Sequence, residues 1–198
     1  MLRRTLEFFF PPAVATRAEL EAFVRGEASY LAQKCVIGYC RVKTMQDYEK
    51  LLTEAAFRDG LEACRWEAYA GTLADTLILV EGLLRPAGEP ARQQVADSLA
   101  AFYAPLLGDV PAHRTDWNDA IAAFDERFSR TRQEPPAHPR NVTDGTAKVI
   151  YRLAPIHPRL KGEDLEVVRG DLRLHAVAMH ASMLKRFRRE ALLRELTA

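Results

Sequence analysis

Apolar residues recur at helical spacing along most of this chain. In the stretch from about Thr16 to Lys43 they follow one another mostly at intervals of three or four residues, which is the period of an amphipathic α-helix. They are Leu20, Phe23, Val24, Ala28, Leu31, Cys35, Ile37 and Val42. Thr16, with Glu19 three residues later, matches a capping box at the start of that helix. No segment shows a convincing strand-like alternation, so the pattern predicts an all-α protein.

The segment from about 61 to 84 stands apart because it is apolar on nearly every side. A helix of this kind is usually covered by its neighbours. We therefore expect an irregular bundle of six or seven helices packed around this central helix. The expected core residues within it are Leu73, Leu77, Ile78 and Val80.

Capping residues, glycines and prolines divide the rest of the chain. Thr44 is the expected N-cap of the helical stretch that leads into the central helix, and Gly60 is its expected kink because glycine is costly inside a helix. Further helices are expected at about 90–107, 115–130, 143–153 and 163–197, the second of these with Thr115 as its cap and the last with a break at Gly170.

We expect a single helical domain over 1–198. It includes an extended N-terminal segment at 1–15, a proline-rich connection at 132–142 and the C-terminal helix at 163–197. The proline-rich connection is the strongest breaker in the chain, but it lies too near the C-terminus to separate two independent domains.

Composition and charge argue against several classes of protein. The chain has 198 residues, 48% of them hydrophobic, and a formal net charge of +1, so no overall field favours nucleic acid. No run approaches the roughly 20 apolar residues that span a bilayer. The three cysteines are too few for a disulfide framework and favour a reducing compartment. We therefore expect a cytoplasmic protein.

Asp75 is the most informative single residue, because it lies in the most apolar part of the chain. Glu67, Gly71, Asp75 and Gly82 fall near one line along the predicted central helix. A buried carboxylate must be paired, hydrogen-bonded or protonated. The preferred interpretation is a structural pair with an Arg, His or Thr of a neighbouring helix. The alternative is a ligand site inside the bundle.

The histidines and cysteines do not show the spacing of a metal site. No Glu-x-x-His occurs, which argues against a di-iron bundle. His175 and His180 point about 140° apart on a helix. His180 is interpreted as a core residue, or alternatively as a ligand beside Glu67 and Asp75, and its face is predicted to be buried with Ala176, Val177, Met183, Leu184 and Phe187. Cys35 and Cys40, five residues apart, are interpreted as small apolar residues. We expect no metal site and no cofactor.

Two exposed features remain. A basic cluster near the C-terminus comprises Lys185, Arg186, Arg188 and Arg189. It is interpreted as a solvated face, or alternatively as a surface for an acidic partner. Phe8, Phe9 and Phe10 precede two prolines. This segment is expected to seal the core, with docking to a partner or to a membrane surface as the alternative.

No motif of a dehydrogenase, P-loop enzyme, serine hydrolase or zincin occurs in the chain. We expect a non-enzymatic interaction protein, an adaptor or assembly factor, that binds a protein partner or itself. Two alternatives stay open. One is a small-molecule or metal-binding bundle, or an enzyme, centred on Asp75. The other is a peripheral membrane or nucleic-acid binder that uses the basic C-terminal third. A contiguous apolar surface patch would favour the interaction protein. A closed pocket near Asp75 would favour the small-molecule or metal-binding bundle.

Overall fold

The structure is a computed structural model that describes residues 12–109 and 116–198. Helices make up 78% of it, and the described residues contain no strand beyond one isolated bridge. The prediction of an all-α bundle is therefore confirmed. Among the described helices, none combines the length and the apolarity that a membrane-spanning helix requires.

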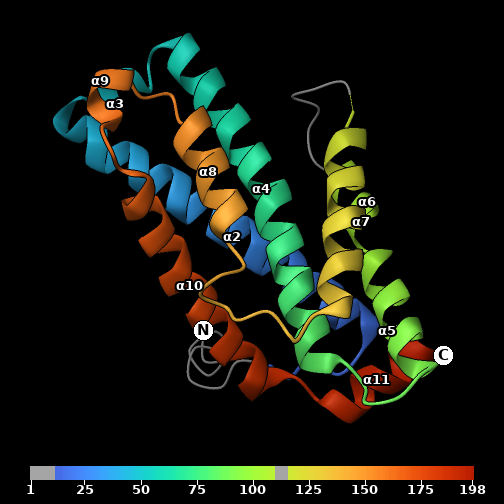
Figure 1. Cartoon of the computed structure of the whole chain (residues 1–198). Coiled ribbons are helices and arrows are strands. Elements are labelled where there is room, and N and C mark those ends of the chain that lie inside the picture. The colour runs from blue at the N-terminus through green and yellow to red at the C-terminus, as the bar shows by residue number, and fades with distance from the viewer. Residues whose placement is uncertain (1–11, 110–115) are drawn as a thin grey trace, which may run out of the picture.

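Figure 1 shows the order and arrangement of the helices. They are α2 (Arg17–Thr44), the 3₁₀ turn η1 (Met45–Asp47), α3 (Tyr48–Leu51), α4 (Ala55–Leu84), α5 (Ala91–Ala100), α6 (Tyr103–Gly108), α7 (Asn118–Gln133), α8 (Asp144–Leu153), α9 (Pro158–Lys161), α10 (Leu165–Arg186) and α11 (Arg189–Thr197).

Helix α4 is the centre of the bundle, as its apolar sequence predicts. It contacts α2, α5, α6, α7, α8, α10 and α11, and in Figure 1 it runs between α8 on one side and α7 on the other. Leu73, Leu77, Ile78 and Val80 are all buried, with exposed fractions of 2% or less. Because α4 has neighbours all round, it needs no polar face.

The start of α4 differs from the prediction at Thr44 and at Gly60. Thr44 does not cap a new helix: its hydroxyl donates to the Cys40 carbonyl at 2.8 Å, one turn earlier, and closes the last turn of α2. The chain then turns through η1 and α3, and α4 begins at Ala55. Gly60 lies inside α4 without a break.

The helices that follow α4 also differ in their bounds from the predicted ones. The single helix expected over 90–107 is two helices, because α5 ends at Ala100 and α6 begins at Tyr103. Pro105 explains this break, since its nitrogen has no proton to donate and its ring crowds the carbonyl four residues earlier. Helix α7 begins at Asn118, and the predicted cap at Thr115 lies outside the described residues. Helix α8 matches the expected helix at 143–153.

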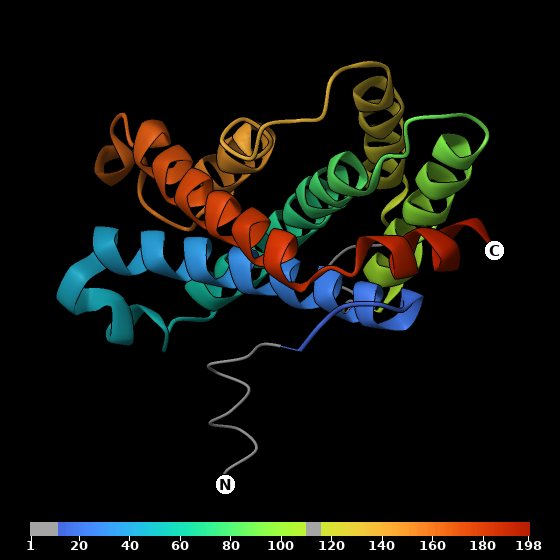
Figure 2. The same ribbon diagram turned by 90° about the horizontal axis from the view of Figure 1, so that it is seen from below.

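The C-terminal helical stretch is interrupted at Phe187 and Arg188, not at Gly170. The backbone of Val14 pairs with this interruption. The Val14 amide donates to the Arg186 carbonyl and the Arg188 amide donates to the Val14 carbonyl, both at 2.9 Å. The backbone of Val14 thus takes the place of the helical partners that the Arg186 carbonyl and the Arg188 amide would have in a continuous helix. Figure 2 shows α10 beside α2, with α11 leading towards α5.

One face of α4 carries glycines at intervals of eleven residues, which is three helical turns. The chain from Pro136 to Pro155 runs along this face in the opposite direction. A Cβ on Gly82 would lie 3.1 Å from Pro136, one on Gly71 would lie 2.6 Å from Thr146, and one on Gly60 would lie 3.0 Å from Pro155. The glycines therefore allow α8 and its flanking loops to lie close against α4.

Candidate functional site

Asp75 obtains its partners from the protein itself, as the structural interpretation predicts. Its side chain on α4 is fully buried. Thr146 of α8 donates a hydrogen bond to Oδ2 at 2.6 Å. Nη2 of Arg127, on α7, lies 2.8 Å from Oδ1 and forms an ion pair. Asp75 therefore holds α7 and α8 against the central helix.

The ion pair of Asp75 lies at the edge of the core. The Arg127 side chain is 28% exposed, and its Nη2 also donates to the Val142 carbonyl at 2.6 Å. Burial raises the pKa of Asp75, while the Arg127 charge and the Thr146 hydrogen bond oppose that rise. Loss of Arg127 would leave a carboxylate in the core with one neutral hydrogen-bond donor.

The other two predicted ligand residues are not among these partners. Glu67 lies half-buried two turns before Asp75 on α4, and His180 lies half-buried on α10. Within the described residues, the ion pair and the hydrogen bond of Asp75 involve Arg127 and Thr146 instead. The structure thus does not join Glu67, Asp75 and His180 into one site.

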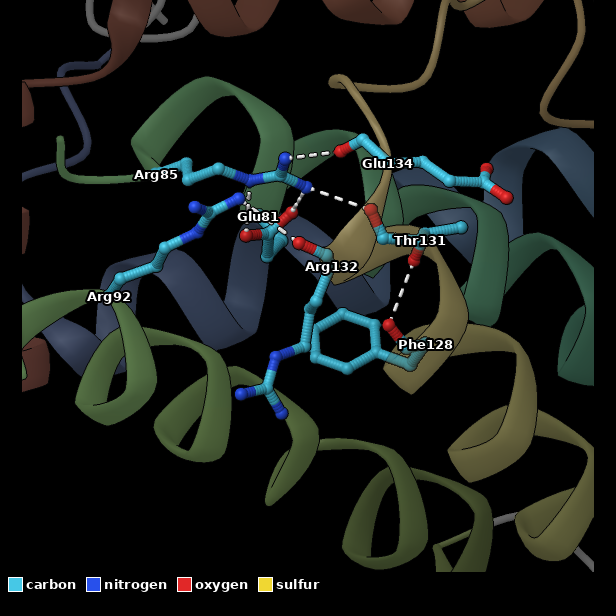
Figure 3. Close-up of polar contacts among 7 residues, drawn as sticks. All are labelled: Glu81, Arg85, Arg92, Phe128, Thr131, Arg132 and Glu134. Carbon is cyan, nitrogen blue, oxygen red and sulfur yellow. Dashed lines mark hydrogen bonds and ion pairs between the residues drawn. The ribbon is translucent and has the colours of Figure 1, made fainter. Parts of the chain in front are cut away.

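A second buried carboxylate, that of Glu81, lies near the C-terminal end of α4. Glu81 accepts two hydrogen bonds from Arg85, at 2.8 and 2.6 Å, and their side chains are 3% and 9% exposed. Arg85 also donates to the carbonyls of Thr131 and Glu134 at the end of α7 (Figure 3). All three guanidinium nitrogens of Arg85 donate hydrogen bonds within the bundle, so we interpret this network as a connection between α4 and α7.

Two residues of the predicted basic cluster, Arg186 and Arg189, form contacts within the protein. Arg186 donates to the Pro12 carbonyl at 3.0 Å, and its guanidinium lies over the Phe23 ring at 4.9 Å. Arg189 donates to the Arg85 carbonyl at 3.0 Å. Lys185 and Arg188 are exposed. The predicted aromatic segment Phe8, Phe9 and Phe10 lies outside the described residues.

Helix α10 has apolar residues on two opposite faces, and the protein covers only one. Val168, Leu172, Ala176, Met179 and Met183 face the core. The opposite face exposes Val167, Leu174, Val177 and Leu184 by 60%, 67%, 36% and 60%. The prediction that Val177 and Leu184 are buried with His180 is therefore wrong, because periodicity does not show which of two apolar faces a neighbour will cover.

The exposed face of α10 follows a heptad pattern. Its apolar and small residues come at alternating intervals of three and four, the spacing of a coiled-coil interface. They are Val167, Gly170, Leu174, Val177, Ala181 and Leu184, hereafter the α10 seam. The seam is a continuous apolar strip on the surface of a single helix.

The flank of α10 that faces α2 brings together three potential metal ligands. The ligating atoms of Cys35, Asp171 and His175 all lie within 4.8 Å of one another. The sequence did not predict this group, because Cys35 is far along the chain from the pair on α10. The detectable signal was the spacing of Asp171 and His175, which is one helical turn.

Comparisons with known proteins give no relative for this arrangement. No family model matches the chain, and neither the curated proteins nor the solved structures contain a significant match.

Proposed function

We propose that this protein is a helical interaction protein that associates with a second copy of itself through the α10 seam. The observation that supports this proposal is the row of large exposed side chains at Val167, Leu174, Val177 and Leu184. Contiguous apolar patches on soluble domains typically mark interaction sites. Burial of apolar surface contributes roughly 25 cal/mol per Å², so covering this row favours association.

The seam is symmetric about its midpoint, between His175 and Ala176. In an antiparallel pair related by a two-fold axis there, Val167 meets Leu184 of the other copy and Leu174 meets Val177. Gly170 meets Ala181, so small residues face each other and the two helices can approach closely. A two-fold interface requires a surface that is complementary to itself, and the order of large and small residues in the seam satisfies this requirement.

The charges that flank the seam have the same symmetry. Glu166 and Lys185 are exposed and lie at equal distances from the midpoint, one at each end of α10. In the antiparallel pair each Glu166 is level with Lys185 of the other copy across the seam, and Glu166 also pairs with Arg169 of its own helix. A parallel pair would instead place like charges together. Charge complementarity thus favours a second copy in the antiparallel orientation.

The first experiment measures oligomeric state by sedimentation equilibrium. We expect the wild type to be a dimer at micromolar concentration and Leu174→Glu to be a monomer, because the substitution places two carboxylates at the centre of the interface. Leu160→Glu is the matched control: Leu160 is 51% exposed and lies on α9, which is not part of the seam, and this variant should remain dimeric. The proposal would be contradicted if the wild type stayed monomeric even when its concentration was raised about 100-fold above the micromolar range.

The second experiment tests orientation by charge reversal. Glu166→Lys and Lys185→Glu should each weaken self-association by a few-fold, since exposed ion pairs contribute about 0.2–1 kcal/mol each. A mixture of the two variants restores both pairs and should form a heterodimer of about wild-type affinity. If the mixture associates no better than either variant alone, the antiparallel arrangement is excluded.

We also propose that this assembly is cytoplasmic. The support is that Cys35, Cys40 and Cys64 are all free and buried thiols, as expected in a reducing compartment. Fractionation of cells that produce the protein tests this location, and recovery in a secreted fraction would contradict it.

A further inference from the structure

Cys35, Asp171 and His175 form a compact group between two rigid helices. Cys35 lies on α2, and Asp171 and His175 lie one turn apart on α10, where residues i and i+4 share a face. The Cys35 side chain is 1% exposed, while those of His175 and Asp171 are 18% and 43% exposed. Cys35 thus lies in the core, whereas Asp171 and His175 are accessible to solvent.

The separation of His175 and Asp171 matches metal ligation better than direct hydrogen bonding, while Asp171 is also within hydrogen-bonding reach of the Cys35 thiol. His175 Nε2 lies 3.5 Å from Asp171 Oδ1, which is longer than the usual 2.7–3.2 Å of an N–H···O hydrogen bond. Ligands at about 2.0–2.3 Å from a tetrahedral Zn²⁺ ion are roughly 3.3–3.8 Å apart. The 3.5 Å separation falls inside this range, and the thiol lies within 4.8 Å of both other ligands.

The donor set selects the class of ion. A thiolate, an imidazole and a carboxylate together suit Zn²⁺ and its neighbours in the first transition series, whereas Mg²⁺ and Ca²⁺ prefer oxygen ligands. We propose that Cys35, Asp171 and His175 bind one Zn²⁺ ion. None of the three ligands belongs to the α10 seam, and Zn²⁺ binding can be measured whether or not the protein dimerises.

A hollow between α2 and α10 lies beside Cys35 and Asp171. This hollow has a volume of about 440 Å³, and both Cys35 and Asp171 line it, together with apolar groups that include Val42 and Val167. Zinc sites with three protein ligands and one open position bind water or substrate there. The hollow leaves room for a water molecule or another small ligand on an ion bound by the three residues.

Formation of the sulfur–metal bond displaces a proton. A cysteine binds a metal ion as its thiolate, so the Cys35 thiol gives up its proton when the ion binds. The metal ion takes the place of that proton, which passes to solvent, and one proton is released per ion bound.

The probe for this site is the metal alone. Isothermal titration of the full chain with Zn²⁺ should give one ion per chain. Titration with Co²⁺ should give the absorption of a tetrahedral complex and a sulfur-to-cobalt charge-transfer band. Cys35→Ser and His175→Gln should each weaken Zn²⁺ binding by more than about 100-fold, since even outer-shell changes cost 10–100-fold. Cys35→Ser should also abolish the charge-transfer band.

The chain provides matched controls on the same two helices. Cys40→Ser replaces another buried cysteine of α2, and His180→Gln replaces another half-buried histidine of α10. Both variants should bind Zn²⁺ as the wild type does. His175 is partly exposed, so His175→Gln keeps the test valid if Cys35→Ser fails to fold. Absence of Zn²⁺ binding by the wild type, or unchanged binding by His175→Gln, would overturn the proposal, as would equal loss in the two controls.

Discussion

Thr146 occupies the space that any residue larger than glycine would need at position 71. A Cβ on Gly71 would lie 2.6 Å from the Thr146 hydroxyl oxygen, well inside van der Waals contact. The same hydroxyl donates to Asp75 at 2.6 Å. One side chain of α8 therefore accounts for two features of α4, a glycine and a carboxylate one turn apart.

The first prediction concerns this close approach. Gly71→Ala should destabilise the protein by about 1–3 kcal/mol, the usual cost of overpacking, because Thr146 must move and weaken its hydrogen bond to Asp75. Gly26→Ala is the control. Gly26 lies on α2 with nothing within 4 Å of a new Cβ, so this change should stabilise by about 0.5–1 kcal/mol. Urea unfolding measures both, and equal effects would contradict the close packing of α8 on α4.

The second prediction concerns the partner of Asp75. Arg127→Gln should destabilise the protein by about 3–5 kcal/mol at neutral pH, because it leaves a buried carboxylate without a countercharge. Adding Asp75→Asn should recover part of that loss, since the double variant buries no charge. Thermal or chemical unfolding of the two variants measures this coupling. If the double variant is no more stable than Arg127→Gln, Asp75 is not ionised in the folded protein.

The same variant predicts a pH dependence. Burial raises the pKa of Asp75 above its ordinary value, so protonation favours the folded state. The contribution of Asp75 is largest below its unfolded pKa and is lost as pH rises through the folded pKa. Arg127 opposes the rise in pKa, and its removal raises the pKa further. The destabilisation by Arg127→Gln should therefore be smaller at pH 5 than at pH 7, as unfolding curves at the two pH values would show.

The third prediction concerns the central position of α4. Leu77 is completely buried, so Leu77→Ala should cost about 2–5 kcal/mol. The free energy of unfolding in urea measures this cost. A loss below about 1 kcal/mol would mean that α4 tolerates a cavity in the middle of the bundle, which contradicts its close packing against its neighbours.

Features encoded within one or two helical turns could be predicted from the sequence. The capping box of Thr16 and Glu19 is present as expected. The all-round apolar pattern of 61–84 correctly identified the central helix, and the need to balance Asp75 indicated partners of the types found. These predictions succeeded because spacing, capping and the cost of burying a charge act locally, whatever the neighbouring helix is.

The tertiary structure decided which surfaces and side chains meet. Helix α10 breaks at Phe187 because the backbone of Val14 takes its hydrogen bonds, and no proline or glycine marks that position. The sequence of α10 alone does not distinguish its covered apolar face from its exposed one. Cys35 and His175 are 140 residues apart and meet only because α2 and α10 pack side by side. Such relationships depend on the packing of whole helices, so no local pattern encodes them.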